Sequence, residues 1–194
     1  MIQTADEKMA EVSRLLTRRV VKNREDPALR LSAVLLLCYK KAEDYCVLFN
    51  KRTEKVEFNK GDICFPGGSK DPEDGDLITT ALRETREEMG IDPTDVTILG
   101  ELDSTTTNSG FSIKPYVGTI PSPYNFTPSK DEVAEVLEIP FASLLSEAIL
   151  REETRVLPDG QIDRGRAYVY GPHYIYGATA RILTQFIDTV RGSL

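Results

Sequence analysis

The amino-acid sequence predicts an α+β fold in which helices flank a mixed β-sheet. Strand-like apolar runs are spread along the chain, and segments with apolar residues at helical spacing lie between them and towards both ends. With 194 residues, 40% of them apolar, the chain can form one substantial core. We therefore expect a single domain over residues 1–194, with residues 1–29 forming a helical extension at the N-terminus.

The elements can be predicted in order along the chain. Residues 6–22 place apolar side chains on one helical face. Two β-rich runs, residues 31–39 and 45–50, are separated by a short polar segment and predict a hairpin of buried strands. A short strand over residues 61–65 ends in a Pro-Gly-Gly turn with a permissive backbone. Further strands are expected over residues 96–102, 113–120, 133–139 and 167–170, and further helices over residues 141–150 and 176–190.

The best-defined helix lies between Asp76, a good N-cap residue, and Gly90, which stands where a C-cap glycine belongs. Along one side it carries the carboxylates of Glu84, Glu87 and Glu88, related as i, i+3 and i+4. The other side is expected to pack on the core. Its residues are Ile78, Leu82, Thr85 and Met89.

Three carboxylates on one helical side repel one another. At this spacing and an effective dielectric near 20, each pair repels by roughly 3 kcal/mol. A hard divalent cation, which prefers oxygen ligands, would relieve that repulsion. The alternative is a solvated acidic face, which is the ordinary interpretation of an isolated Glu-x-x-Glu-Glu pattern.

The residues around this helix resemble the signature of the Nudix hydrolases. That signature is Gly, five residues, Glu, seven residues, and then Arg-Glu-apolar-any-Glu-Glu-any-Gly-apolar. Residues 83–91 match its second half, with Thr85 in the apolar position. Counting from Gly68, Asp74 stands in place of Glu, and eight residues rather than seven separate it from Arg83. This longer, Asp-containing version resembles the branch that cleaves coenzyme A.

Other segments resemble the coenzyme A pyrophosphatases as well. Residues 47–68 resemble their upstream signature, except that Asn59 stands where these enzymes usually have His. Residues 132–140 and 174–183 resemble two later segments, with Tyr176 in place of Trp. The resemblance therefore covers nearly the whole chain and implies the Nudix αβα sandwich.

The resemblance also implies a chemistry, the hydrolysis of a phosphoanhydride with Mg²⁺ or Mn²⁺ as cofactor. It implies Glu84 and Glu88 as the leading metal ligands, with Glu87 beside them and a backbone carbonyl at Gly68 contributing. The catalytic set is Arg83, Glu84 and Glu87. Glu84 is a candidate base for the attacking water, and Arg83 is expected to orient a glutamate through its two-pronged donors.

Residues outside the helix supply the candidates for substrate binding. Arg52 and Lys51 either contact the substrate's phosphates, which arginine binds well, or form surface ion pairs. Asn59 retains a hydrogen-bond donor and acceptor but cannot become cationic like the usual His. We expect the substrate to be a small nucleotide derivative, coenzyme A in the first place.

Four other residues are candidates for weaker roles. Asp74 has one expected role, and the other three have two possible interpretations each. Asp74 is expected to support the turn or the helix rather than to bind metal directly. Glu132 and Glu135 are either a distal ligand or base, or solvent-facing strand residues. For His173, the sole histidine, packing or a local hydrogen bond is favoured over catalysis.

Composition narrows the class of protein. A formal charge of −7 argues against a nucleic-acid surface but allows an anionic substrate, because bound metal and local cations reverse the local field. Cys38, Cys46 and Cys64 lie in apolar runs without metal-ligand spacing and are interpreted as reduced core residues. No signal peptide and no apolar run of membrane-spanning length is evident, so we expect a cytoplasmic protein without membrane contact. Nudix enzymes are often dimeric, and a homodimer is one expected assembly.

Three functions remain open at this point. The first is a coenzyme A pyrophosphatase that yields 3′,5′-ADP and 4′-phosphopantetheine. The second is a hydrolase of another nucleoside diphosphate derivative, such as ADP-ribose, a dinucleotide or a nucleoside triphosphate. The third is a nucleotide-binding module without turnover, against which the complete set of Arg83, Glu84, Glu87 and Glu88 argues.

Overall fold

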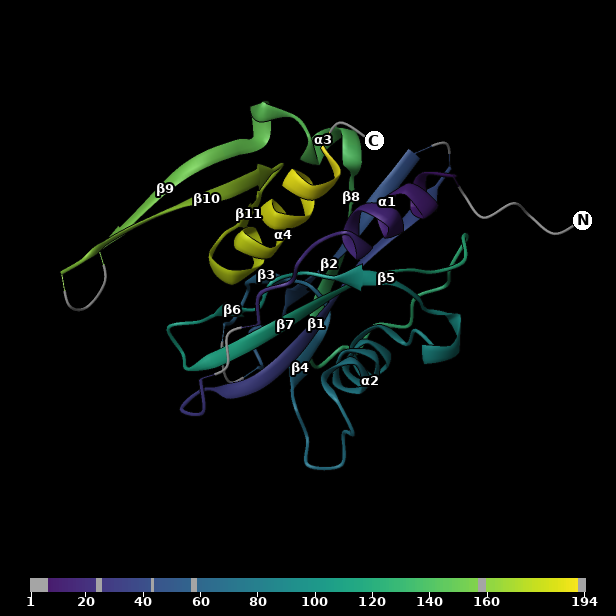
Figure 1. The fold of residues 1–194 in the computed structure, drawn as a ribbon, viewed down its shortest axis with the longest axis horizontal. Coiled ribbons are helices and arrows are strands. Elements are labelled where there is room, and N and C mark those ends of the chain that lie inside the picture. Colours follow the sequence, from purple (N-terminus) through teal and green to yellow (C-terminus); the bar gives the residue numbers. More distant parts are fainter. Residues whose placement is uncertain (1–6, 24–25, 43, 57–58, 157–159, 192–194) are drawn as a thin grey trace, which may run out of the picture.

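A computed structural model describes residues 7–23, 26–42, 44–56, 59–156 and 160–191. They form a large mixed sheet with helices on both sides and a smaller antiparallel sheet (Figure 1). The α+β architecture predicted from the sequence is therefore confirmed. No helix in this described part of the chain is long and apolar enough to cross a membrane.

The large sheet is built around one long hairpin. Its strands are β1 (Arg30–Lys41), β2 (Asp44–Arg52), β3 (Ile63–Cys64), β4 (Gly67–Ser69), β5 (Thr97–Glu101), β6 (Thr105–Thr106), β7 (Phe111–Thr119) and β8 (Val133–Pro140). Strands β1 and β2 are antiparallel, as the hairpin prediction requires, whereas β1 and β7 are parallel. The main order is β3-β2-β1-β7-β5, with β4 paired to β1, β6 to β7 and β8 to β2.

Alternate residues of β1 serve two different cores. Leu35 and Leu37 belong to the cluster shared with α2 (Leu77–Met89), while Leu36 belongs to the cluster shared with α1 (Glu7–Thr17) and α4 (Gly177–Val190). This alternation follows from the two-residue period of a strand. The result is an αβα sandwich, with α2 on one side of the sheet and α1 and α4 on the other (Figure 1).

The prediction of a helix over residues 141–150 was wrong for the second half of that range. Helix α3 covers only Phe141–Leu144, a 3₁₀ turn follows at Glu147–Ile149, and the chain then enters β9 (Leu150–Val156). Strand β9 pairs with β10 (Ile162–Tyr170), which pairs with β11 (His173–Ile175). Figure 1 shows β9 and β10 extending away from the body as an arm. Charged residues dominate β9, so no strand-like apolar pattern indicated it.

The first helix is shorter than predicted. It ends at Thr17, although helical spacing continued to residue 22. Beyond it, Arg19 Nη2 lies 3.2 Å from Asp103 Oδ1, and the Lys22 N–H donates to the same atom at 3.0 Å. The Ser104 N–H donates to the Lys22 carbonyl at 3.1 Å. These long-range contacts hold the segment in a non-helical path across the body.

Candidate active site

Helix α2 begins and ends at the predicted caps. The Asp76 side chain accepts a hydrogen bond from the Thr79 N–H at 2.9 Å, which is the N-cap contact. Gly90 has φ of 69°, the left-handed conformation of a C-cap glycine. A Cβ at Gly90 would lie 1.8 Å from Thr127 Oγ1, so the loop between β7 and β8 packs directly on the helix end. Within that loop, the Ser129 N–H donates to the Glu88 carbonyl at 2.8 Å.

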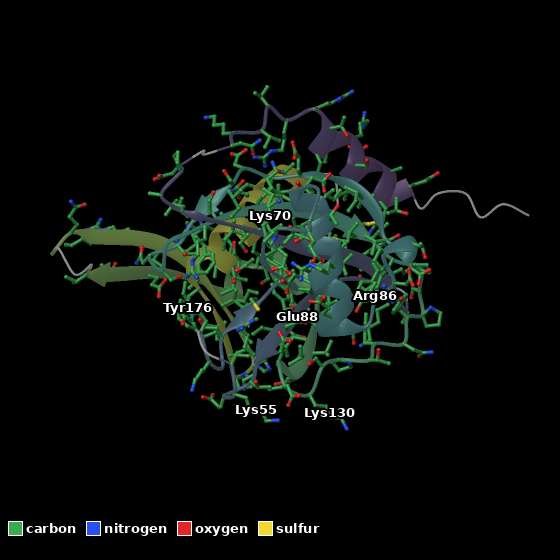
Figure 2. The ribbon with its side chains drawn as sticks, turned by 90° about the horizontal axis from the view of Figure 1, so that it is seen from below. Lys55, Lys70, Arg86, Glu88, Lys130 and Tyr176 are labelled. Atoms are coloured by element: carbon green, nitrogen blue, oxygen red, sulfur yellow. The ribbon has the colours of Figure 1, made fainter. Side chains whose placement is uncertain are left out.

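The carboxylates of α2 are not equally placed. The side chains of Glu87 and Glu84 are 55% and 17% exposed, whereas Glu88 is 2% exposed. Figure 2 shows Glu88 toward the centre of the molecule while Arg86 of the same helix points outward. Thr85 and Met89 are buried as predicted, but Glu88 joins them on the packed side. The expectation of one packed side and one acidic side was therefore wrong for Glu88.

Arg83 organises the first group of charges, which we call the Arg83 network (Asp74, Arg83, Glu84 and Glu87). Its Nε and Nη2 atoms donate to the two carboxylate oxygens of Asp74 at 3.0 and 2.9 Å. Its Nη1 atom donates to Glu84 Oε1 at 2.9 Å and to Glu87 Oε2 at 3.1 Å. A bond from Nη2 to the Ser69 carbonyl at 3.1 Å ties the network to β4. The Arg83 hydrogen bonds hold the pKa of Asp74 well below its usual range.

Glu88 lies in a different environment, which we call the Glu88 niche (Asn50, Arg52, Gly67 and Glu88). Glu88 Oε2 accepts from Asn50 Nδ2 at 2.9 Å and from the Gly67 N–H at 3.2 Å. Arg52 Nη1 lies 3.6 Å from Glu88 Oε1. Burial raises the pKa of Glu88 to about 8, and the charge of Glu84 adds to the rise; the Gly67 N–H and Arg52 oppose it without cancelling it.

The two glycines of β4 allow the acids to approach the sheet. A Cβ at Gly68 would lie 2.4 Å from Glu84 Cδ, so the carboxyl group rests directly on the glycine backbone. A Cβ at Gly67, where φ is 149°, would lie 2.3 Å from the Ala33 carbonyl oxygen. The Gly68 carbonyl accepts a bond from Ser32 Oγ at 2.6 Å. Its predicted contact with a metal stays a prediction.

Glu84 and Glu88 have the chemistry that a divalent cation requires. Burial is the main cause that raises the pKa of both groups, and a positive ion beside them would offset it. Their oxygens suit Mg²⁺ or Mn²⁺. Within the described residues, no three Asp, Glu, His or Cys side chains converge as a ready-made metal cage. An ion here would take its remaining ligands from backbone oxygen, water or substrate phosphate, as Mg²⁺ commonly does.

The comparison with known proteins decides the family. A protein-family model described as NUDIX domain matches residues 29–152. The chain belongs to the Nudix family. Proteins named Uncharacterized Nudix hydrolase NudL are similar to it: that of Pectobacterium atrosepticum is 38% identical over 144 residues, 72% of each chain. That of Citrobacter koseri is 33% identical over 177 residues, 90% of each chain. The protein is accordingly a pyrophosphohydrolase, an enzyme that cleaves phosphoanhydride bonds.

Solved structures support the Nudix fold alone. A MutT/nudix family protein from Enterococcus faecalis superposes with a TM-score of 0.57 at 18% identity, covering 97% of this chain and 75% of that chain. The MutT protein from Methanosarcina mazei Go1 gives a TM-score of 0.55 at 16% identity, covering 89% and 99%. At such identities the shared property is the αβα arrangement.

A cavity of about 480 Å³ borders β4, the strand that the acids of the Nudix helix contact. Gly67 and Gly68 form part of its wall, so the backbone that touches Glu84 on one side borders the cavity on the other. Two of the predicted substrate-binding residues, Arg52 and Asn59, line it. Lys51 is not among the described residues of its lining.

Asn59 has a backbone reason for its identity. Its φ is 54°, and its carbonyl accepts from the Asp62 N–H at 3.3 Å in a tight turn. Asn adopts this left-handed conformation more readily than most residues. Asp62 in turn accepts a hydrogen bond from the Tyr176 hydroxyl at 2.6 Å. Asn59 is therefore compatible with the backbone of this turn.

The structure separates the remaining candidates. The charge of Glu132 is the smallest of the causes that raise the pKa values of Glu84 and Glu88. Glu135 Oε1 instead lies 3.5 Å from His173 Nε2, a contact between β8 and β11. The cysteines are free thiols, with Cys38 and Cys46 buried and Cys64 partly buried in the cavity wall; a cytoplasmic location stays a prediction.

Sequence reasoning missed two residues of this site. Asn50 contacts Glu88, and the Ser69 carbonyl contacts Arg83. For Asn50 one signal exists, because it is a polar residue that directly follows the apolar run of β2. For Ser69 there was none, since the contact uses only its backbone.

Proposed function

We propose that this Nudix hydrolase cleaves the diphosphate of coenzyme A or its derivatives, with Mg²⁺ or Mn²⁺, to give 3′,5′-ADP and 4′-phosphopantetheine. One observation carries the proposal: the partly buried Glu84 and the buried Glu88 lie against a glycine strand that also borders a cavity lined by Arg52. A diphosphate at this strand would meet a cation site and the start of a binding cavity together.

Each residue of the site has a distinct task in this proposal. Glu84 and Glu88 hold the divalent ion, with Glu87 at the exposed edge. When bound, that ion stabilises phosphate oxygens and acidifies water. Arg83 fixes Glu84 and Glu87 through one Nη1 atom. Glu84 is the candidate proton acceptor. Arg52, which lies 3.6 Å from Glu88 and lines the cavity, is the candidate phosphate contact.

The departure from the common Nudix signature supports the coenzyme A branch. The loop before α2 is one residue longer and carries Asp74 in place of Glu. Asp74 nevertheless forms a two-pronged ion pair with Arg83. The longer loop therefore keeps a partner for Arg83, which is what a working variant of the signature requires.

The runner-up substrate is another nucleoside diphosphate derivative, because Asn59 lines the cavity where the related enzymes have His. A hydrolysis panel separates the two. Coenzyme A, NADH, ADP-ribose, a diadenosine polyphosphate and a nucleoside triphosphate are offered with Mg²⁺ and with Mn²⁺, and products are identified by mass. We expect dominant release of 4′-phosphopantetheine from coenzyme A. Preferred cleavage of another diphosphate would contradict the proposal.

Glu84→Gln distinguishes an enzyme from a binding module. We expect kcat to fall by roughly a thousandfold, because a metal ligand and candidate base is lost together. Circular dichroism should show an intact fold. The matched control is Glu73→Gln, which neutralises an exposed carboxylate in the preceding loop and should leave kcat unchanged. Equal activity of Glu84→Gln and the wild type would exclude the assigned role.

A further inference from the structure

The floor of the cavity is a row of paired residues that crosses four strands. Ser69 of β4 pairs with Ser32 of β1, Ser32 pairs with Ile113 of β7, and Ile113 pairs with Thr105 of β6. The first three of these residues line the cavity. The row spans three strand spacings, or roughly 14 Å at about 4.8 Å each.

At each end of this row, an arginine side chain donates hydrogen bonds to the strand. At the β4 end, Arg83 Nη2 donates to the Ser69 carbonyl, which is where the Arg83 network meets the sheet. At the β6 end, Arg181 of α4 donates from Nε to Thr105 Oγ1 at 3.0 Å and from Nη2 to the Thr106 carbonyl at 2.6 Å. These bonds hold the Arg181 guanidinium at the cavity wall, away from the proposed scissile site.

Between the two ends, the lining is mixed. Val34, Phe65 and Ile113 supply apolar surface. Among the described lining residues, Arg52 and Arg181 are positive and Asp62 is negative, and Asp62 already accepts a bond from Tyr176. The cavity thus offers apolar surface and two guanidinium groups from different elements, which suits a ligand with a ring system and two separate anionic groups. A nucleoside that carries a phosphate at each side of its ribose has this shape of charge.

We propose that the cavity takes the nucleoside half of the substrate and that Arg181 contacts a phosphate on its ribose, distal to the diphosphate that is cleaved. The inference rests on the proposed function for its choice of half, since 3′,5′-ADP is the nucleoside half of coenzyme A. The pantetheine half is neutral and would gain nothing from a second arginine. Arg181 is therefore a specificity residue for the ribose phosphate.

Binding of the isolated half tests this without turnover. Titration calorimetry with 3′,5′-ADP and with 5′-AMP, both in Mg²⁺, compares the wild type with Arg181→Gln. We expect the wild type to bind 3′,5′-ADP roughly tenfold more tightly than 5′-AMP, as a charge-assisted hydrogen bond would give. Arg181→Gln should lose that preference and keep its affinity for 5′-AMP. Equal weakening of both ligands would indicate a structural role and overturn the inference.

Two further variants keep the test decisive. Arg181→Lys keeps the charge and should keep part of the preference, even if β6 shifts slightly. Arg166→Gln is the matched control, because Arg166 is a neighbouring exposed arginine that pairs with Asp188 at 3.3 Å and does not belong to the described lining of this cavity. It should bind both nucleotides like the wild type. A loss of preference in Arg166→Gln would mean that general surface charge, and not Arg181, selects the phosphate.

Turnover separates this inference from the proposed function. The wild type should cleave coenzyme A with a kcat/KM roughly tenfold above that for dephospho-coenzyme A, and Arg181→Gln should cleave both alike. Equal turnover of both substrates by the wild type, with equal binding of the two nucleotides, would overturn the inference and leave the proposed function intact. Cleavage of neither substrate, with the nucleotide preference still dependent on Arg181, would refute the proposed function and support the binding site.

Discussion

On the Arg83 side of α2, one guanidinium donates to three carboxylates and to a backbone carbonyl of β4. In the Glu88 niche, one carboxylate oxygen accepts from an amide side chain and a backbone N–H, and the nearest guanidinium nitrogen of Arg52 is 3.6 Å from the other oxygen. The Arg83 network is a set of opposite charges at hydrogen-bond distance. The Glu88 niche holds a buried carboxylate mainly through neutral hydrogen-bond donors.

The difference shows in the pKa values. The Arg83 hydrogen bonds depress the pKa of Asp74, whereas burial raises that of Glu88 to about 8. A depressed pKa means that the folded protein favours the charge, and a raised pKa means that it does not. The Arg83 network therefore serves to position side chains. In the Glu88 niche the negative charge of the carboxylate is not fully compensated, and a bound divalent ion can compensate it.

Breaking the Arg83 network at its buried end should lower turnover more than loosening the Glu88 niche does. Asp74→Asn removes the charge that receives Arg83 Nε and Nη2, so the guanidinium is free to shift away from Glu84. We expect kcat to fall by roughly 10- to 100-fold, as for loss of a group that orients a metal ligand. Steady-state kinetics with the best substrate of the panel measures the change.

Asp71 provides the control for that experiment. Its carboxylate lies 3.7 Å from Arg83 Nη2 and its side chain is 60% exposed, so Asp71→Asn removes a charge near the same guanidinium without the buried hydrogen bonds. It should change kcat by less than about twofold, as expected for an exposed ion pair. Equal losses in the two variants would mean that net charge, rather than geometry, explains the effect of Asp74.

Local features of the sequence were sufficient to predict the position of α2. Asp76 and Gly90 cap it through contacts within a few residues, and apolar runs alone predicted the β1–β2 hairpin. Strand β9 was missed because it alternates no apolar residues that a period-two pattern could reveal. The end of α1 was missed because its terminus depends on Asp103, a partner far along the chain.

The same reasoning explains what the sequence could predict about the site. The spacing of Glu84, Glu87 and Glu88 places them on one side of a helix, but it does not say which of them faces the sheet. Glu88 is buried because Asn50 and Gly67, 38 and 21 residues away, supply its hydrogen bonds. Periodicity carries no information about such donors, so the division of α2 into a network and a niche required the structure.

The raised pKa of Glu88 predicts a pH-dependent stability in metal-free enzyme. A carboxyl group whose pKa is about 8 in the folded protein, instead of the ordinary 4.5, lowers stability as pH rises between these two values, because the unfolded chain ionises first. The penalty is absent below about pH 4.5 and complete above about pH 8. With EDTA at pH 8.5, Glu88→Gln should therefore be more stable than the wild type by on the order of 2 kcal/mol, and Tm should rise by roughly 4–8 °C.

Thermal melts from pH 5 to pH 9 give the decisive comparison. The advantage of Glu88→Gln should shrink towards pH 5, where the wild-type carboxyl group is also neutral. Glu87→Gln neutralises the exposed neighbour and should show no such pH-dependent gain. A stability gap for Glu88→Gln that is the same at every pH would assign the effect to packing and not to ionisation.

The smallest expected effect concerns Asn50, the donor that only the structure revealed. Asn50 is 1% exposed; its Nδ2 atom donates to Glu88 Oε2, and its Oδ1 atom has no hydrogen-bond partner among the described residues. Asn50→Ala would leave Glu88 Oε2 with only the Gly67 N–H and loosen the carboxylate, so Mn²⁺ affinity should fall by about tenfold. Asn50→Thr restores a donor and should recover most of the Mn²⁺ affinity.

Because Asn50 lies outside the described cavity lining, KM should stay within about twofold while kcat falls at limiting metal. Paramagnetic titration of Mn²⁺ reads the affinity directly, and unchanged binding in Asn50→Ala would show that the backbone N–H alone positions Glu88.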